Sequence, residues 1–127
     1  MIEALFNNNS YVAAKKMLDA TALRQEALAS NLANLETPNY KRIDVAPSFT
    51  TELNQALGAG NTERISALQP KLEVDSTAVA QSRDGNTVNL ETELADLQQN
   101  TLAHGLETQL ISYQLLRLQT AITGRTA

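Results

Sequence analysis

The last third of the chain carries a row of residues spaced alternately four and three positions apart. Its members are Leu90, Leu94, Leu97, Thr101, His104, Thr108, Ile111, Leu115, Leu118 and Ile122. Because an α-helix turns once in about 3.6 residues, this spacing keeps the row on one helical face, as in the seam of a coiled coil. The row therefore predicts a long C-terminal helix that needs a partner helix.

Local signals set the ends of this helix. Asn89 can cap its first turn, and Gly124 can end it, because glycine readily adopts the left-handed conformation beyond a helix. The helix dipole agrees with these ends: acidic residues gather at the start, and Arg117 and Arg125 lie toward the end. The acidic residues are Glu91, Glu93 and Asp96.

A second helix is predicted near the N-terminus, over roughly residues 11–35. Ser10 can act as its N-cap, and Pro38 disfavours its continuation. Its repeating row has the same helical spacing and consists of Tyr11, Ala14, Leu18, Thr21, Gln25, Leu28, Leu32 and Leu35. We expect the two terminal helices to pair as a coiled-coil hairpin, which makes the fold mainly α.

The segment between the helices is polar and broken by glycine and proline. We expect an irregular middle, with a possible short helix from Phe49 to Leu57 and a possible brief hairpin using Leu72, Val74 and Val79. One axial domain then has three parts: an N-terminal helix and turn at 1–42, the middle at 43–86, and the C-terminal helix at 87–127.

The length of the C-terminal helix predicts an elongated molecule. It would run about 50 Å, whereas a compact domain of 127 residues spans only about 35 Å. Its apolar surface is wider than one partner helix covers. A second chain, or alternatively the middle segment folding back, would have to cover residues outside the seam, namely Leu102, Leu106, Leu110, Tyr113 and Leu116.

Composition argues against several function classes. The chain has 14 acidic and 10 basic residues, a net charge of -4 and no cationic block, so nucleic acid is not an expected partner. It has no cysteine and a single histidine, His104, which we interpret as a packed or interface residue. Glu91 and Glu93 are too far apart around a helix to form a paired-carboxylate site. We expect no enzyme activity, metal or cofactor.

The N-terminal sequence and the hydropathy of the chain indicate how the protein relates to membranes and secretion. The N-terminus has no basic region followed by an apolar core, so a cleaved signal peptide is not expected. No stretch reaches the roughly 20 apolar residues of a membrane span, and we expect no direct lipid binding.

The end of the first helix carries a motif. The segment 30–40 reads S-N-L-A-N-L-E-T-P-N-Y and resembles the N-x-A-N-x-x-T-P-G-Y signature of bacterial flagellar rod and hook proteins. Asn39 replaces the usual glycine, and asparagine tolerates positive φ. The matching residues are Asn31, Ala33, Asn34, Thr37, Pro38 and Tyr40.

The chemistry of the motif suits a helix terminator. Small Ala33 lets another backbone approach, the asparagine amides can bond free carbonyls, Pro38 turns the chain, and Tyr40 can anchor the turn on a neighbour. The alternative for such a motif alone is an ordinary helix C-terminus. Six matched positions favour the family.

Two further segments narrow the resemblance. Residues 84–94 are similar to the D-G-N-x-V-x-x-x-x-E stretch of proximal-rod proteins of the B type, and residues 121–125 to their A-I-x-G ending. Taken alone, Asp84-Gly85-Asn86 is a turn rather than a calcium loop. His104 stands where relatives place tyrosine, and Gly105 interrupts a good helix, which suggests a local kink or a tight contact.

The resemblance implies a structural subunit of the proximal rod of the flagellar basal body. Such a protein reaches the periplasm through the flagellar type III export apparatus and transmits torque. Its partners would be other copies, other rod proteins, the rod-to-ring adaptor subunit and the membrane ring. The alternatives are a soluble helical adaptor or chaperone in a closed complex, and a small enzyme.

Two groups of residues are candidates for these roles. The predicted assembly seam consists of Leu18, Leu28, Leu32, Leu94, Leu97, Ile111, Leu115, Leu118 and Ile122. Phe49 and Leu53 resemble the element by which early substrates engage the export gate; the alternative is a short amphipathic helix that buries both side chains.

Overall fold

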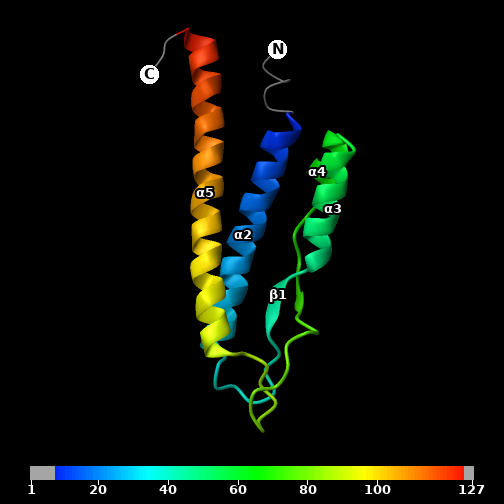
Figure 1. Ribbon diagram of the computed structural model, residues 1–127, viewed down its shortest axis with the longest axis vertical. Helices are drawn as coiled ribbons and strands as arrows, with labels where there is room; N and C mark the ends of the chain where they lie inside the picture. The colour runs from blue at the N-terminus through cyan, green and yellow to red at the C-terminus, as the bar shows by residue number, and fades with distance from the viewer. Residues whose placement is uncertain (1–7, 125–127) are drawn as a thin grey trace.

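Two long helices run in opposite directions along the molecule (Figure 1). Helix α2 covers Asn9–Ala33 and helix α5 covers Leu90–Thr123. The structure is a computed structural model that describes residues 8–124; residues 1–7 and 125–127, among them Arg125, lie outside the described range. The two helices pack against each other, so the predicted helical hairpin and the mainly α fold class are confirmed.

The ends of the helices follow local capping. Asn89 Oδ1 accepts a hydrogen bond from Thr92 N at 3.0 Å, and Gly124 ends α5 with φ 65°, as predicted. The start of α2 was predicted wrongly, because Asn8 and not Ser10 is the cap: Asn8 Oδ1 accepts from Ser10 N at 3.0 Å. Both residue types cap helices well, and the earlier cap adds a half turn.

The middle segment contains more regular structure than expected. Helix α3 (Pro47–Gly58) confirms the possible short helix, and Pro47 fits its first turn because proline needs no backbone donor there. Helix α4 (Thr62–Ala67) was not predicted. Its cap is Asn61, whose Oδ1 accepts from Arg64 N at 2.9 Å.

Two short strands hold the base of this segment. Strand β1 (Ile43–Val45) pairs antiparallel with strand β2 (Leu72–Val74), with Asp44 opposite Glu73. The expected hairpin partner of Leu72 and Val74 was wrong, because Val79 lies outside the strands and is exposed.

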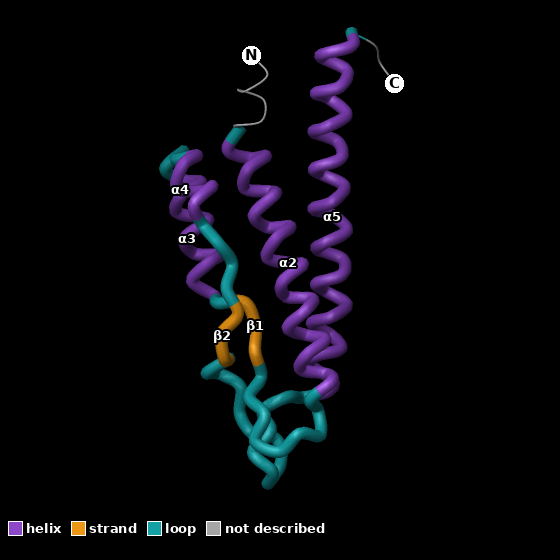
Figure 2. Tube along the Cα trace, turned by 180° about the vertical axis from the view of Figure 1, so that it is seen from behind, coloured by secondary structure: helices purple, strands orange, loops and turns teal. Residues whose placement is uncertain are grey.

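The apolar core lies between α2 and the pair α3 and α4. Its buried members are Ala13, Phe49, Leu53, Ala56 and Ile65. Helix α5 packs on the other side of α2, so α2 is the central layer (Figure 2). The middle segment therefore does not fold back over α5, and the outer leucines of α5 remain exposed: Leu102 is 70% exposed and Leu106 63%.

Hydropathy of the helices was also as expected. Between residues 8 and 124, none of the helices combines the length and the apolar character that crossing a bilayer requires.

Candidate assembly interface

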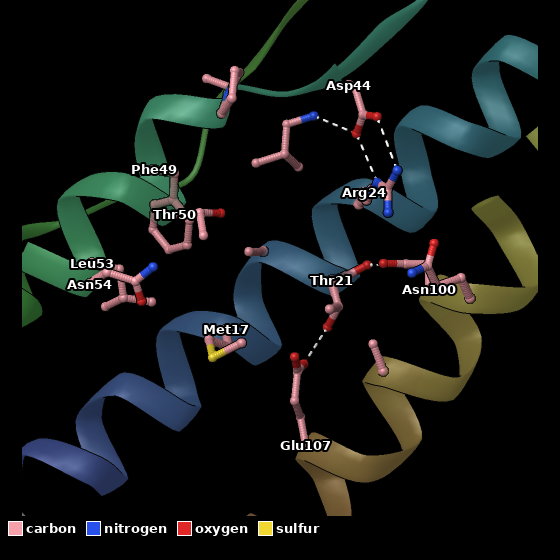
Figure 3. Close-up of a pocket in the computed structure, with 16 residues that line it drawn as sticks. Met17, Thr21, Arg24, Asp44, Phe49, Thr50, Leu53, Asn54, Asn100 and Glu107 are labelled. Carbon is pink, nitrogen blue, oxygen red and sulfur yellow. Dashed lines mark hydrogen bonds and ion pairs between the residues drawn. The ribbon is translucent and has the colours of Figure 1, made fainter. Parts of the chain in front are cut away.

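The contact between α2 and α5 is polar at its centre (Figure 3). Thr21 Oγ1 donates to Glu107 Oε2 at 2.8 Å and lies 3.1 Å from His104 Nδ1. Asn100 Nδ2 donates to Thr21 O at 2.9 Å and to Gln25 Oε1 at 2.8 Å. The buried residues of α5 are thus Glu93, Asn100 and Glu107, and none of them is apolar.

The structure divides the predicted seam. Leu28 is fully buried, and five members are half-buried: Leu18, Leu32, Leu97, Ile111 and Leu118. The other three members are exposed, namely Leu94, Leu115 and Ile122. The expected apolar stripe therefore does not face α2 as a unit, since its neighbours Glu93, Asn100 and Glu107 occupy the centre of that face. Its role in assembly stays a prediction.

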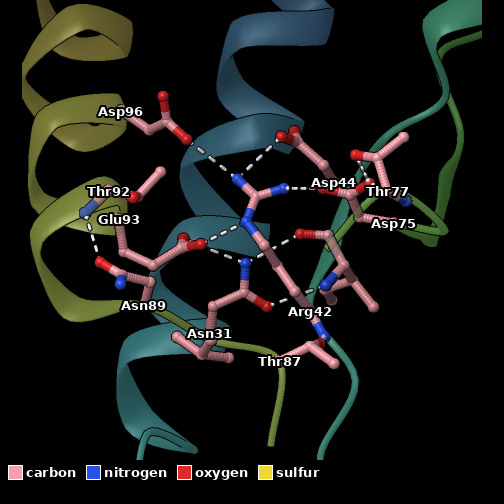
Figure 4. A network of polar contacts seen from close by, with 12 residues as sticks. Asn31, Arg42, Asp44, Asp75, Thr77, Thr87, Asn89, Thr92, Glu93 and Asp96 are labelled. Atoms are coloured by element: carbon pink, nitrogen blue, oxygen red, sulfur yellow. Dashed lines mark hydrogen bonds and ion pairs between the residues drawn. The ribbon is translucent and has the colours of Figure 1, made fainter. Parts of the chain in front are cut away.

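A buried arginine joins β1, β2 and α5 below this contact (Figure 4). The Arg42 guanidinium binds Asp75 at 2.8 Å, Asp44 at 3.0 Å and Asp96 at 3.0 Å, and its Nε donates to Glu93. The Arg42 side chain is only 8% exposed and that of Glu93 is fully buried. Burial by itself opposes the charged guanidinium, but hydrogen bonding and attraction to Glu93 and Asp44 outweigh it and raise the Arg42 pKa.

Two aspartates of this cluster, Asp44 and Asp75, are held in the charged form. Burial disfavours the Asp44 carboxylate, yet bonds from Arg24 Nε (3.0 Å) and the Val45 amide (2.7 Å) lower its pKa. The Asp75 pKa is lowered by the Thr77 hydroxyl and amide, and then by Arg42. Sequence reasoning read Glu93 and Asp96 only as partners of the helix dipole; their buried partner Arg42 was missed.

The motif residue Asn31 ties three elements together from the end of α2. Its Nδ2 donates to Ile43 O at 2.8 Å and to Glu93 Oε2 at 3.1 Å. Its Oδ1 accepts from Ile43 N at 3.0 Å and from the Tyr40 hydroxyl at 3.2 Å. A buried amide with all of its groups bonded fixes one arrangement of α2, β1 and α5.

The other motif residues build the turn after α2. Asn34 Nδ2 donates to Ser30 O at 2.8 Å, and Thr37 Oγ1 donates to Asn34 Oδ1 at 3.1 Å. The neighbour on which Tyr40 anchors the turn is α2 of its own chain, through Asn31 and Ser30. Ala33 and Pro38 are exposed, where another chain can approach them.

The second segment that resembles the family, residues 84–94, contacts the turn formed by the first segment, residues 30–40. Asn86 Nδ2 donates to three carbonyl oxygens at the end of α2, those of Asn34 (2.9 Å), Leu35 (3.0 Å) and Thr37 (2.9 Å). The Thr87 amide donates to Tyr40 O at 3.1 Å. Residues 84–86 do form the expected turn, but sequence reasoning missed that this turn caps a helix about 50 residues earlier.

Two residues of the turn require unusual backbone angles. Asn39 has φ 61°, which agrees with its replacing the family's glycine. Its amide donates to Asp84 O at 2.8 Å. Gly85 has φ 79°, which favours glycine, and a Cβ there would lie 2.6 Å from Asn39 Oδ1, so the Asn39 side chain would also have to move.

The structure explains His104 but gives no reason for a glycine at position 105. His104 is half-buried against Thr21, in agreement with a packed histidine. Gly105 has no tight contact within the described chain: apart from its chain neighbours and the backbone of its own helix, no atom lies within 4 Å of a Cβ placed there, and α5 continues through it.

Phe49 and Leu53 lie in the apolar core, 5% and 3% exposed. Their burial at i and i+4 on α3 is the structural alternative that the sequence left open. A role in engaging the export gate is not tested by the folded chain.

The buried polar side chains between α2, β1 and α5 form hydrogen bonds with one another or with the backbone. Between residues 8 and 124, no buried side-chain nitrogen or oxygen lacks a hydrogen-bond partner, and no acidic and histidine side chains gather in a metal-binding arrangement. Such saturated clusters fix the register of packed helices.

Comparison with known proteins identifies the family. Residues 18–41, which span the motif turn, match the model of the flagella basal body rod proteins. A flagellar basal body rod protein FlgB of Cereibacter sphaeroides is 33% identical over 109 residues, covering 80% of this chain and 84% of the relative. That of Borrelia hermsii is 30% identical, covering 76% and 83%, and that of Salmonella typhimurium is 29% identical, covering 87% and 90%. The matched residues include Asn31, which bonds the end of α2 to β1 and α5, and the chain belongs to the family of flagellar basal body rod proteins.

Proposed function

We propose that this chain is a structural subunit of the proximal rod of the bacterial flagellar basal body. The observation that carries the proposal is the unpartnered outer surface of α5, on which leucines remain more than half exposed although the hairpin is complete. A long helix with such a surface is a component of a larger assembly, because monomers rarely leave wide apolar stripes in water. The relatives are all named as basal body rod proteins, so the assembly that we propose is the rod.

The location and partners follow from the same assignment. In this proposal the subunit reaches the periplasm by flagellar type III export. It binds other copies of itself, other rod proteins and the adaptor that joins the rod to the membrane ring. Its function is mechanical, since the locked register of α2 and α5 suits torque transmission and the proposal needs no catalytic step.

Deleting the gene in its host and examining purified basal bodies by electron microscopy tests the proposal. We expect membrane rings without a rod and loss of swimming. Wild-type chain should restore both, whereas Leu115→Asp, at an exposed position of the predicted seam, and Ile111→Asp, at a half-buried one, should not. Gln98→Asp is the matched control because it adds the same charge at an exposed polar site of α5.

Complete flagella in the deletion strain, with no duplicate gene, would reject the rod assignment. A closed complex of fixed stoichiometry between this chain and one helical protein would favour the adaptor alternative. Export of the Asp variants into the medium, measured with the rod absent, separates a failure of assembly from a failure of secretion.

We further propose that Phe49 and Leu53 engage the export gate before the chain folds. The proposal rests on the sequence pattern alone. Phe49→Ala should then reduce secretion more strongly than Ile65→Ala, which removes a side chain from the same core. Equal secretion of the two variants would leave Phe49 with a purely structural role.

A further inference from the structure

A groove lies over α2, between α3 and α5 (Figure 3). Phe49 and Leu53 of α3 form one side, Met17 of α2 forms the floor, and Glu107 of α5 forms the other side. The groove encloses about 400 Å³, and further apolar lining comes from Ala20, Val45 and Ala103. Met17 is 45% exposed in it, so the floor is open to a side chain from outside.

A stripe on α5 has the shape that such a groove accepts. Leu102, Leu106, Leu110 and Tyr113 follow one another at steps of four, four and three residues, which places them on one side of the helix. They are 70%, 63%, 56% and 59% exposed. None of the four lines the groove, so one chain carries both an apolar donor surface and a separate apolar acceptor surface.

The charges of the two surfaces are complementary. In the groove, Arg24 neutralises Asp44, but the buried carboxylate of Glu107 has no ion-pair partner among residues 8–124 and accepts only from Thr21. Arg117 continues the stripe four residues beyond Tyr113, is exposed, and makes no ion pair within the same range. A stripe seated in the groove would bring a cation to an unneutralised carboxylate.

We propose that the α5 stripe of one copy, Leu102 to Arg117, seats in the α2–α3–α5 groove of the next copy. The inference rests on the proposed function and names the contact between copies within the rod. Donor and acceptor are different surfaces, so the contact is head-to-tail and leaves a free donor and a free acceptor at the two ends of every row. Such a contact permits growth beyond a dimer.

Disulfide crosslinking in assembled rods tests the contact, because the natural chain has no cysteine. Asn54→Cys stands at the rim of the groove and Tyr113→Cys on the stripe; both positions are exposed. A chain with both changes should give a ladder of dimers, trimers and higher rows on oxidation, and each single variant should give none. Gln119→Cys, at an exposed α5 position outside both the stripe and the predicted seam, replaces Tyr113→Cys in the control and should give no ladder.

The charge pair is tested in the same rods. Arg117→Glu should weaken the ladder about tenfold, as expected when an interfacial attraction becomes a repulsion. In a chain that also carries Glu107→Gln, which keeps an oxygen for the Thr21 hydroxyl but removes the charge, Arg117→Glu should weaken the ladder much less. Arg117→Gln should have an intermediate effect.

The outcomes separate this contact from the rod assignment. Absence of the chain from purified rods refutes the proposed function. Presence in rods with no ladder, with an equal ladder from Gln119→Cys, or with the Asn54 cysteine joined to a different protein refutes the contact alone. A ladder that Arg117→Glu does not change refutes the charge pairing.

Discussion

Arg42 shows at the scale of one residue how this chain tolerates a polar interior. Four carboxylates surround its guanidinium, those of Asp44, Asp75, Glu93 and Asp96. Each would be costly to bury alone, and together they are stable only with the cation between them.

We therefore expect Arg42→Met to lower the free energy of unfolding by about 3–5 kcal/mol, because it leaves Glu93 buried and unpaired. Urea unfolding followed by circular dichroism measures the change. Lys71→Met, which removes an exposed cation, is the control and should change the value by less than about 0.5 kcal/mol. Equal effects would show that the cluster does not hold the fold.

Two glycines provide an opposed pair of predictions. Gly85→Ala should destabilise by about 1–3 kcal/mol, because φ is 79° and the new Cβ meets Asn39 Oδ1. Gly105→Ala lies in an open helical position and should stabilise by up to about 1 kcal/mol. Thermal unfolding of both variants checks the signs. If Gly105→Ala is stable but fails to build rods, the glycine serves a contact between subunits.

At the scale of secondary structure elements, the helix ends were predictable and the helix faces were not. Asn89 and Gly124 act on neighbouring residues, so the sequence alone reveals them. The buried face of α5 depends on distant partners: Glu93 is buried because Arg42 and Asn31 reach it from elsewhere in the chain. A periodic row of leucines cannot show which of them face solvent in the folded chain.

A second prediction concerns the C-terminal end of helix α2, where Asn86 binds the chain. Asn86→Asp keeps the acceptor for the Val88 amide but replaces the donor that binds three carbonyls with an oxygen that repels them. We expect a loss of about 1–3 kcal/mol and early hydrogen exchange at residues 30–34. Asn54→Asp, at an exposed site of α3, should leave both measurements near wild type.

The whole molecule is elongated, as its longest helix predicted. Its accessible surface is 8437 Å², whereas a compact monomer of 13.8 kDa has about 6,600 Å². The sequence identified the family through the turn at Asn31 to Tyr40, yet gave no sign that residues 84–87 and Arg42 complete that turn, since their partners lie far along the chain.

Acid should unfold this molecule through the same cluster. Asp44 and Asp75 have pKa values below their ordinary 3.8 when folded, so the unfolded chain binds more protons as pH falls. Their contribution to the free energy of unfolding is full above about pH 4 and is lost as pH falls through their folded pKa values. A pH series of urea midpoints should drop below pH 4, and less steeply in a variant carrying Asp44→Asn and Asp75→Asn. An unchanged slope in that variant would contradict the linkage.

The contacts between the N-terminal part of the chain and α5 also determine the order in which the parts of the chain can fold. Asn31 and Arg42 need Glu93, and Thr21 needs Glu107, so a chain delivered from its N-terminus cannot finish the lower half of α2 until residue 93 has arrived. The core of α2, α3 and α4 has all of its members before residue 66 and can form first. The α2–α5 hairpin can therefore form only after the last third of the chain has been delivered. A chain whose delivery stops before that point lacks the contacts between α2 and α5.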